Sequence, residues 1–545
     1  GGPAPWQRPP AEGGQSAGAA WRLASGLASS LALRFLATRR RAYGGGGYNF
    51  SAGEQARRSE EKSKRETADF WSMRKRAAQR GAQPKSDRYW GYEEKKMFQA
   101  AHVSRGINFD KYNDIPVETS GGQGTEEPIE SFAQACEKFG LAQELSDNLA
   151  RCGYDKPTPV QKYSLPSAMV GTDVMCSAQT GSGKTAAFLV PLVATILKEG
   201  AQVADEKAVG PSCVVMAPSR ELCQQIAVEA KRLCFKTTVR VVSIYGGAPA
   251  ADQLRELADG CDIAICTPGR LDDFLNRGVL TMEKVRHLTL DEADRMLDMG
   301  FEPQIRRIIE DHGMPEPGLG EDERQTTMFS ATFPQEMQDM ALDFLDPGYI
   351  QISVGRVGSM NADVEQRFVD AANGDKFDAL LRSIEEVTDG NGKVAKTLVF
   401  ANMKSTVDDI RARLEQNNIR ASCIHGGLAQ PQRDRALAAL KRGSVQAVVA
   451  TDVAARGLDI PGIDHVVNFD LPGNSEDYVH RIGRTGRIGN KGIATSLVGY
   501  RENSLQNIVR LLQEQDGEGV EVPEWLEEKA VGGRGGRSHG GPPPF

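Results

Sequence analysis

The stretch Ala178-Gln179-Thr180-Gly181-Ser182-Gly183-Lys184-Thr185 decides the fold of this chain. A β-prone run, residues 173–177, leads into it, and an apolar helical pattern follows from Ala186. A strand, a glycine-containing turn and a helix that opens with Gly-Lys-Thr form a cradle for phosphate. Backbone N–H groups of the turn and of the helix N-terminus face the anion, and the lysine adds a cation. The strict pattern begins with Gly where this chain has Ala178, which is a small steric change. We therefore predict a nucleotide site in preference to an ordinary Gly-Ser loop.

A second element of the predicted site is Asp291-Glu292-Ala293-Asp294, directly after the β-prone run 288–290. A carboxylate at the end of a parallel strand beside a phosphate loop can hold Mg²⁺. We expect Thr185 and Asp291 to bind Mg²⁺, and Glu292 to orient and deprotonate the attacking water. An acidic cluster alone is usually the solvated start of a helix, so this interpretation depends on the phosphate loop that precedes it.

The overall composition of the chain limits the number of domains and the class of protein only broadly. The chain of 545 residues is long enough for about two to four domains. Its formal net charge of −7 does not decide for or against a nucleic-acid partner, because basic residues crowd the segment 57–88 and recur in the final Arg-Gly tail. Nine cysteines without a C-x-x-C pair favour reduced structural thiols over disulfides or a zinc site. No apolar run is long and charge-free enough to cross a membrane.

Strand-like and helical patterns alternate twice along the chain, which is typical of parallel sheets with crossover helices. The first series of strand-like runs comprises residues 174–177, 213–217, 239–244, 263–266, 288–290 and 326–329. The second comprises residues 397–401, 421–425, 447–451, 465–469 and 493–497. We expect an α/β protein with a disordered extension at 1–125, a first domain at 126–352, a linker at 353–363, a second domain at 364–515 and a disordered Gly/Arg-rich tail at 516–545.

Two segments near the ends of the chain have a distinct composition. Residues 21–43 are rich in Ala, Leu, Ser and Arg and contain no acid, which suits either an organelle transit peptide or a basic helix. The last residues contain Gly-Gly-Arg-Gly-Gly-Arg, which is either a solvated linker or a weak RNA-binding segment. We expect a cytoplasmic protein, with the nucleus as a second compartment and organelle targeting as the alternative.

The order of the motifs resembles the DEAD-box RNA helicases, which take their name from the sequence at 291–294. The resemblance extends from about Ser131 to about Val509. It implies two tandem RecA-like domains of the P-loop NTPase class, in helicase superfamily 2. It also implies ATP and Mg²⁺ as cofactors and RNA as a partner. Each short motif is weak alone, since Gly-Gly or Thr-Pro-Gly is ordinarily only a turn. The order of so many motifs carries the weight.

The resemblance assigns the nucleotide contacts of the first domain. Gly153-Tyr154 followed by residues 157–161 is similar to the Q motif, in which Tyr154 would stack on adenine and Gln161 would hydrogen-bond its edge. An upstream aromatic residue would assist, and Phe132 or Phe139 could supply it. The expected contacts of the phosphate loop are Ala178, Gln179, Thr180, Gly181, Ser182, Gly183, Lys184 and Thr185.

The RNA contacts implied by the resemblance lie in both domains. Ser219 stands where the family usually has Thr, and Gly427 stands where Asp is common. The small residues and backbone amides of these motifs predict contacts to phosphate and 2′-OH, with little sequence preference. The expected RNA-binding residues are Pro218, Arg220, Gly247, Thr267, Pro268, Gly269 and Arg270 in the first domain, and Gly426 and Thr451 in the second.

The remaining motifs imply how the domains work together. Residues 451–459 are similar to motif V, in which Gly457 and Asp459 would bind the nucleotide, and residues 480–487 are similar to motif VI. Arg484 and Arg487 would act as arginine fingers only when the domains close, an effect worth roughly 10³ to 10⁵ in rate. Ser330, Thr332 and His480 would couple ATP to RNA.

We therefore expect an ATP-dependent RNA helicase in which RNA and ATP both stabilise a closed state and so strengthen each other's binding. The segments 106–117 and 522–526 resemble the Vasa-like and translation-initiation branch. We expect a monomer that recruits protein partners through its tails. Two alternatives remain: an ATP-gated RNA clamp, which a duplex-release assay separates, and a DNA helicase, which ATPase stimulation by matched RNA and DNA strands separates.

Overall fold

The computed structural model describes residues 52–81, 85–98, 115–122, 126–179, 181–201, 206–318, 320, 322–332, 335–355, 363–388, 394–452, 462–486, 491–500, 502–513 and 522–532. The chain divides into two units, residues 1–63 and 64–545, and both predicted domains lie in the second unit.

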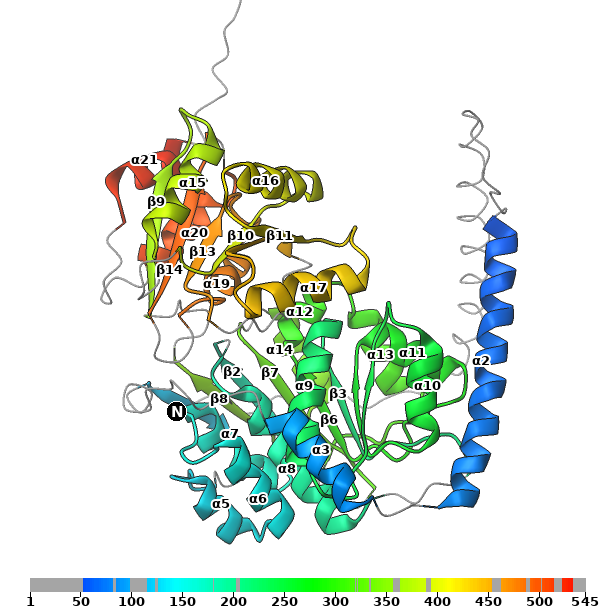
Figure 1. Cartoon of the computed structure of the whole chain (residues 1–545). Helices are drawn as coiled ribbons and strands as arrows, with labels where there is room; N and C mark the ends of the chain where they lie inside the picture. Colours follow the sequence, from blue (N-terminus) through cyan, green and yellow to red (C-terminus); the bar gives the residue numbers. More distant parts are fainter. Residues whose placement is uncertain are drawn as a thin grey trace, which may run out of the picture. The chain divides into compact units, whose positions relative to one another are not determined.

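The first domain is built on an eight-stranded sheet with the order β1-β8-β2-β7-β6-β3-β5-β4 (Figure 1). Its strands are β1 (Val117–Gly121), β2 (Val174–Ala178), β3 (Cys213–Met216), β4 (Val241–Ile244), β5 (Ile263–Cys266), β6 (His287–Asp291), β7 (Gln325–Ser330) and β8 (Ile350–Val354). β1 pairs antiparallel with β8, and the other pairs are parallel. The central strands are buried along their whole length, as parallel sheets covered on both faces require.

Helices cover both faces of this sheet. One face packs against α5 (Phe132–Phe139), α6 (Gln143–Cys152), α7 (Pro159–Met169), α8 (Lys184–Glu199) and α9 (Arg220–Leu233). The other packs against α10 (Ala250–Ala258), α11 (Pro268–Asn276), α12 (Ala293–Asp298), α13 (Glu302–Glu310) and α14 (Gln335–Phe344). The alternation of strand side chains divides the core, since Cys176 of β2 joins the first cluster and Met175 joins the second.

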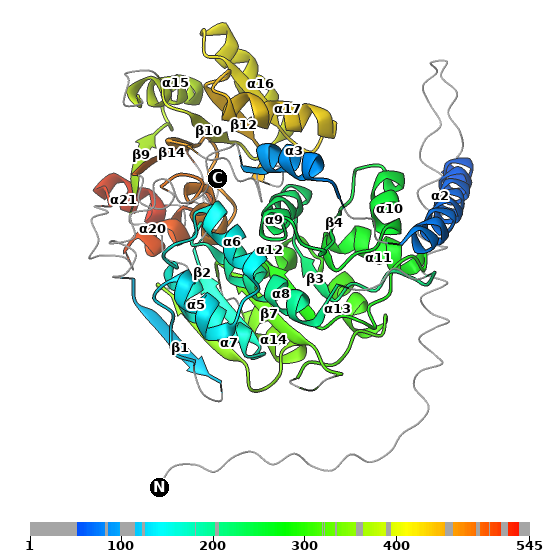
Figure 2. The same cartoon turned by 60° about the horizontal axis from the view of Figure 1, so that its bottom comes forward.

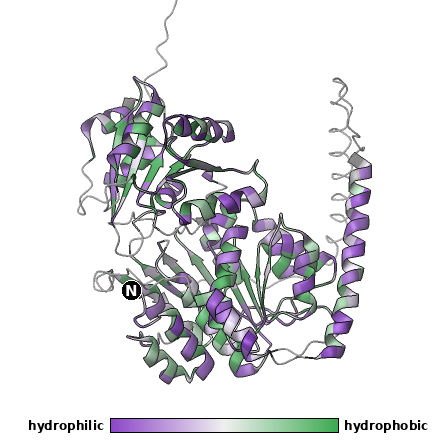
Figure 3. Ribbon diagram, viewed as in Figure 1, coloured by the Kyte–Doolittle hydropathy of each residue, from purple (hydrophilic) through white to green (hydrophobic). Residues whose placement is uncertain are grey.

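The second domain repeats this design on a parallel sheet of six strands with the order β11-β12-β10-β13-β14-β9. Its strands are β9 (Val364–Asp370), β10 (Thr397–Phe400), β11 (Ala421–Ile424), β12 (Ala447–Ala450), β13 (His465–Asn468) and β14 (Gly492–Val498). Its helices are α15 (Lys376–Glu386), α16 (Lys404–Gln416), α17 (Gln430–Lys441), α19 (Ser475–Ile482), α20 (Leu505–Gln513) and α21 (Glu524–Gly532). The strands of both sheets are mostly hydrophobic, and polar residues lie on the outer helices (Figure 3). The predicted two-domain α/β fold is confirmed.

The prediction that residues 1–125 are disordered is wrong for the parts that the structure describes. Two helices, α2 (Ala52–Arg80) and α3 (Asp87–Phe98), and the strand β1 form there. Phe70 of α2 is fully buried in the cluster that also contains Leu257 and Phe274. Arg74 is buried too and donates to the carbonyl of Ala258 at 3.2 Å. These residues recur at helical spacing, but the charged residues around them hid the pattern.

The predicted C-terminal tail, 516–545, also contains a packed segment. Residues 524–532 form α21, and Leu526 is fully buried in a core cluster of the second domain. Lys529 donates to Asp370 of β9 at 2.5 Å. The tail prediction failed here because the few apolar side chains of this segment, among them Trp525 and Leu526, stand next to charged residues and a Gly/Arg-rich sequence.

Two predictions about cysteines and membranes compare directly with the structure. All nine cysteines are free, and all but Cys136 and Cys423 are buried, as expected for reduced structural thiols. Within the described ranges, the helices lack the combination of length and apolar character that a membrane span needs.

Candidate functional site

The phosphate loop lies at the carboxyl end of β2, where parallel-sheet proteins place their ligands. Lys184 is buried at the first position of α8, and its Nζ donates to the carbonyls of Ala178 at 2.7 Å and Ser330 at 3.1 Å. The turn therefore wraps around this ammonium. Ala178 ends a strand and does not have a positive φ, so glycine is not required there.

Two further features show that the loop fits a phosphate ligand. The Ser182 hydroxyl is buried and has no hydrogen-bond partner among the described residues. Gly183 caps α8 with a φ of 89°, and a Cβ atom there would lie 2.5 Å from Nε2 of Gln161. The start of this helix therefore offers backbone N–H groups and a hydroxyl to an anion. Gln179 and Gly181 lie in the same loop, Thr185 is the second residue of α8, and Thr180 lies outside the described residues.

The predicted Q motif contacts the phosphate loop directly. Gln161 Nε2 donates to the carbonyl of Gly183 at 2.9 Å, and its Oε1 accepts from the Thr158 amide at 3.0 Å. The Thr158 hydroxyl donates to the carbonyl of Ser182 at 2.7 Å. A carboxamide has one further hydrogen and one further lone pair, so Gln161 retains the capacity to bind a nucleobase edge.

The predicted adenine-stacking residue, Tyr154, follows the left-handed Gly153 at the end of α6. Its ring lies 5.3 Å from the ring of Phe132, so Phe132 rather than Phe139 is the aromatic neighbour in the structure. Its hydroxyl donates to Oε1 of Glu229 on α9 at 2.8 Å. Burial and the charge of Glu229 raise the pKa of Tyr154 well above its usual value, so the hydroxyl stays a neutral donor.

The acidic motif lies at the end of β6, two strands from β2 in the sheet. Asp291 is buried, and burial raises the pKa of its carboxyl to about 7, while Lys184 opposes the shift. Glu292 has φ 51° and ψ 51°, a left-handed conformation that costs a non-glycine residue about 1–2 kcal/mol. The turn at Glu292 separates β6 from α12.

Asp294 joins the acidic motif to the Ser330-Ala331-Thr332 motif. Its Oδ2 accepts from the Thr332 hydroxyl at 2.9 Å and from the Thr332 amide at 3.1 Å. The same oxygen lies 3.7 Å from Nε2 of His480 in the second domain. Ser330 contributes its carbonyl to Lys184, as described above. The predicted coupling residues Ser330 and Thr332 therefore connect Lys184 and Asp294 of the first domain, and Asp294 faces the third, His480, of the second domain.

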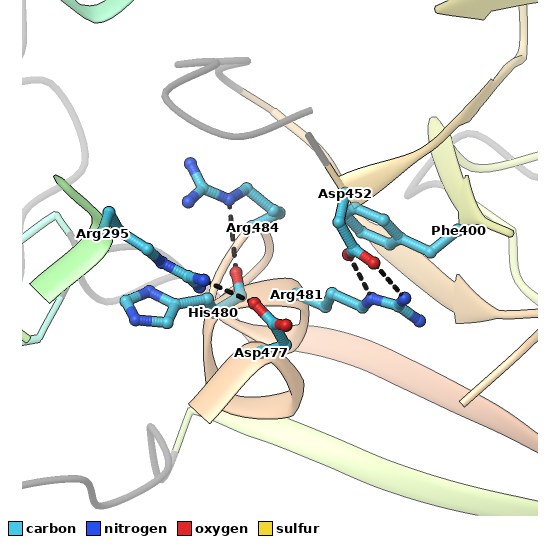
Figure 4. Close-up of a pocket in the computed structure, with 7 residues that line it drawn as sticks. All are labelled: Arg295, Phe400, Asp452, Asp477, His480, Arg481 and Arg484. Carbon is cyan, nitrogen blue, oxygen red and sulfur yellow. Dashed lines mark hydrogen bonds and ion pairs between the residues drawn. The ribbon is translucent and has the colours of Figure 1, made fainter. Parts of the chain in front are cut away.

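A pocket next to this junction is lined by side chains of both domains, namely Arg295, Phe400, Asp452, Asp477, His480, Arg481 and Arg484 (Figure 4). Arg295, directly after the acidic motif, is buried and forms an ion pair with Asp477 of α19. The Nε of Arg484 donates to the carbonyl of His480 at 3.2 Å. Arg487, Gly457 and Asp459 lie outside the described residues.

Five of the seven residues that line this pocket were not among the predicted site residues, namely Arg295, Phe400, Asp452, Asp477 and Arg481. Arg481 donates to both carboxylate oxygens of Asp452 at 2.5 Å and to Asn402 Oδ1 at 2.9 Å. This network fixes α19 against β10 and β12. The ion pair of Arg295 and Asp477 was also missed, because its partners are 182 positions apart. The position of Arg295 beside the acidic motif was the available signal.

The predicted RNA contacts of the first domain gather around one turn. A Cβ atom on Gly247 would lie 2.3 Å from Nη2 of Arg220 and would displace that guanidinium, and the φ of 76° at Gly247 also favours glycine. The Thr267 hydroxyl accepts from the Gly246 amide at 3.3 Å, and Arg270 donates to the carbonyl of Ala248 at 3.1 Å. Pro268 and Gly269 open α11, and Pro218 precedes α9.

The predicted RNA contacts of the second domain lie at the ends of β11 and β12. The Thr451 amide donates to the carbonyl of Ile424, two residues before Gly426, at 3.2 Å. Nδ1 of His425 accepts from the Gly427 amide at 3.2 Å, which leaves Nε2 to donate to Asp408. Across the domains, Arg433 of α17 pairs with Glu221 of α9 at 2.8 Å, and both side chains are buried.

These features define a class of protein: a two-domain P-loop ATPase in which the residues after the acidic motif contact side chains of the second domain. Residues 158–340 match the family model "DEAD/DEAH box helicase", and residues 375–489 match "Helicase conserved C-terminal domain". Together the matches cover more than half of the chain. The chain belongs to the DEAD/DEAH-box helicase family, and it is an ATP-dependent RNA helicase with RNA-stimulated ATPase activity.

Solved structures are similar over most of the chain. S. cerevisiae Dbp5 bound to RNA and ADP BeF3 is 27% identical with a TM-score of 0.57, over 74% of this chain and 98% of that chain. Mss116p, with its NTE and C-tail deleted and bound to ssRNA and AMP-PNP, is 23% identical with a TM-score of 0.62, over 76% and 84%. The second likeness supports the fold alone.

Proposed function

We propose that this helicase hydrolyses ATP when a single RNA strand draws its two domains together. One observation carries the proposal. Helix α12, which begins directly after Glu292, contacts α19 of the second domain through two neighbouring residues: Asp294 faces His480 and Arg295 pairs with Asp477. A change in the position of α19 is therefore transmitted to the residue next to the catalytic carboxylate.

Each binding and catalytic role is assigned to particular residues of the chain. Lys184 and the backbone of residues 178–185 bind the phosphates, and Gln161, Tyr154 and Phe132 bind the base. Glu292 takes the proton of the attacking water. Arg484 and Arg487 approach from the second domain and stabilise the charge of the transition state, an effect worth about 10³–10⁵ in rate. RNA bound to residues 218–220, 247, 267–270, 426 and 451 favours the arrangement in which all these groups meet.

Thr185 and Asp291 form an oxygen donor set that fits Mg²⁺, because this cation prefers hydroxyl and carboxylate oxygens beside phosphates. When bound, Mg²⁺ supplies positive charge to the phosphates. The buried Asp291 carboxyl must be ionised to take part, and the neighbouring Lys184 favours the ionised form.

The test is the steady-state ATPase rate of the full-length protein without nucleic acid, with single-stranded RNA and with a DNA strand of the same sequence. We expect strong stimulation by RNA and little by DNA, with a stimulation that falls steeply as salt rises. A high basal rate that RNA does not change would contradict the proposal, because the domains would then reach the active arrangement alone.

We also propose that the chain lies in the Vasa-like and translation-initiation branch of the family. The support is the sequence at 106–117 and 522–526, and Val522, Trp525 and Leu526 pack against the second domain. A phylogenetic tree of the two-domain core, built without these flanks, tests the proposal. A position among another branch would contradict it.

A further inference from the structure

The helix α3 lies outside the predicted catalytic core but is docked against it. It lies beside α9 in both views (Figures 1 and 2). Trp90 and Phe98 each place a ring 5.4 Å from the ring of Phe235, which follows α9 and is 1% exposed. Glu94, between them on the same helical stripe, pairs with Arg151 of α6 at 3.7 Å. One face of α3 is therefore fitted to the surface that α6 and α9 form.

A continuous chain of polar contacts leads from this helix to Tyr154. Arg232 of α9 donates through Nε to the carbonyl of Met97 at 3.1 Å and through Nη1 to Oε2 of Glu229 at 3.1 Å. The other oxygen of the same carboxylate accepts from the Tyr154 hydroxyl at 2.8 Å. The Arg232 and Glu229 side chains are 15% and 11% exposed. Both charges are thus shielded from water, and charge-assisted hydrogen bonds are strongest in such a shielded environment.

We propose that α3 is a built-in support for the adenine end of the nucleotide site, acting through Arg232 and Glu229 on the ring of Tyr154. The hydrogen bond from the Tyr154 hydroxyl to Glu229 fixes the direction of the ring axis, and the ring of Phe132, 5.3 Å away, restricts rotation of the ring plane about that axis. Stacking on a base requires that plane to be held beforehand. The proposal rests on the role of Tyr154 at adenine given above. Arg232, Glu229 and Trp90 are positioning residues, which act on the base only through Tyr154.

The first variant for the test is Arg232→Met in the full-length protein, which removes both donors and keeps a long side chain. We expect KM for ATP to rise about tenfold, since a lost hydrogen bond to a charged group has roughly that effect. The kcat at saturating ATP and RNA should stay within about twofold, because the phosphate loop and Glu292 are untouched. The ratio of kcat/KM for ATP to that for GTP should fall as the base is held less firmly.

Two further variants test individual contacts between α3 and Tyr154, and a third is a control. Arg232→Lys keeps a cation for Glu229, but a single ammonium cannot serve Met97 as well, so we expect an intermediate KM. Trp90→Ala releases α3 from Phe235 without touching α9 and should raise KM in the same direction. Lys231→Met, one position before Arg232 on the same helix, is the control and should leave KM unchanged. Thermal melting of each variant shows that it is folded.

The decisive measurement is a double-mutant cycle with Tyr154→Phe, which removes only the hydroxyl. If the support acts through this hydroxyl, Arg232→Met will add little to KM in the Tyr154→Phe background. An equal effect of Arg232→Met in both backgrounds would overturn the inference and leave the role of Tyr154 intact. An unchanged KM in Tyr154→Ala would instead overturn the proposed adenine contact itself.

Discussion

The two domains hold their catalytic cations in different ways. In the first domain, Lys184 is held by two carbonyls of its own domain, those of Ala178 and Ser330. In the second, Arg484 donates to the carbonyl of His480 at 3.2 Å, and the helix α19 that contains His480 reaches the first domain through Asp477 and His480. The first domain is thus prepared to bind phosphate alone. Under the proposed function, the second contributes to catalysis only through contacts between domains.

The largest effect expected from this comparison is that of Arg484→Ala. If Arg484 contributes only to the transition state, RNA-stimulated kcat should fall by about 10³–10⁵. The affinity for ADP, measured by calorimetry, should stay unchanged. Arg442→Ala, an exposed arginine at the end of α17, is the control. A parallel loss of ADP affinity would mean that the two domains share ground-state binding, and the comparison would fail.

Glu292→Gln tests the carboxylate of the first domain. Removing a general base should lower kcat by about 10²–10⁴ while ATP and RNA remain bound. The complex with ATP and RNA should dissociate slowly, which filter retention of labelled RNA measures. Glu256→Gln, on the exposed face of α10, should behave like the unaltered protein. Turnover at the unaltered rate would show that another group takes the proton.

The two domains can also be compared by their stability at low pH. Each sheet contains a histidine at the start of a strand, His287 in β6 and His465 in β13. Burial lowers the pKa of both, and that of His465 falls to about 4. Each imidazole is therefore neutral in the folded state. Above the unfolded pKa of about 6.5, protonation does not affect the free energy of unfolding. As pH falls toward 4, the unfolded state takes up the proton first, so the free energy of unfolding decreases, by about 3 kcal/mol for His465.

His465→Gln should make the melting temperature of the second domain less sensitive to pH between 6.5 and 4, since glutamine does not take up a proton there. The amide can still bond to Thr495, the partner of His465 at 2.9 Å. Melting curves recorded at several pH values give the comparison. Equal slopes for the variant and the unaltered protein would show that His465 is not buried as a neutral group.

Lys184→Ala should lower ATP affinity about 10–100-fold, because it removes a charge-assisted contact to phosphate. Lys198→Ala at the other end of α8 is the matched control. Calorimetry with ATP measures both. Unchanged affinity in Lys184→Ala would remove the contrast between a prepared first domain and a dependent second domain.

The smallest expected effect concerns the ion pair of Arg295 and Asp477. Asp477→Asn should raise the RNA concentration needed for half-maximal ATPase activity about tenfold, since it weakens one contact to a charged group. The exchange Arg295→Asp with Asp477→Arg should restore part of the loss. If the double variant is no better than the single ones, the pair does not contribute to the approach of the domains.

The sequence reveals those parts of the site whose chemistry needs neighbouring residues. A phosphate loop requires glycines, a lysine and a hydroxyl in one short stretch, so residues 178–185 were recognisable. Contacts such as Arg232–Glu229–Tyr154 or Arg295–Asp477 join residues that only the fold brings together. The helices α2 and α3 were missed for another reason: the residues that dock them, the buried Phe70 and the partly buried Trp90, lie among charges that are typical of disordered chains.

The position of Glu292 is subject to two conflicting requirements, one from the backbone conformation and one from the proposed catalysis. Its left-handed backbone is a conformation that glycine adopts without strain, so a chain shaped for thermodynamic stability alone would carry glycine there. The general-base role proposed for Glu292 requires a carboxylate at the same point. The enzyme therefore retains a locally unfavourable residue, and its tolerance for further destabilising mutations elsewhere is smaller by that amount.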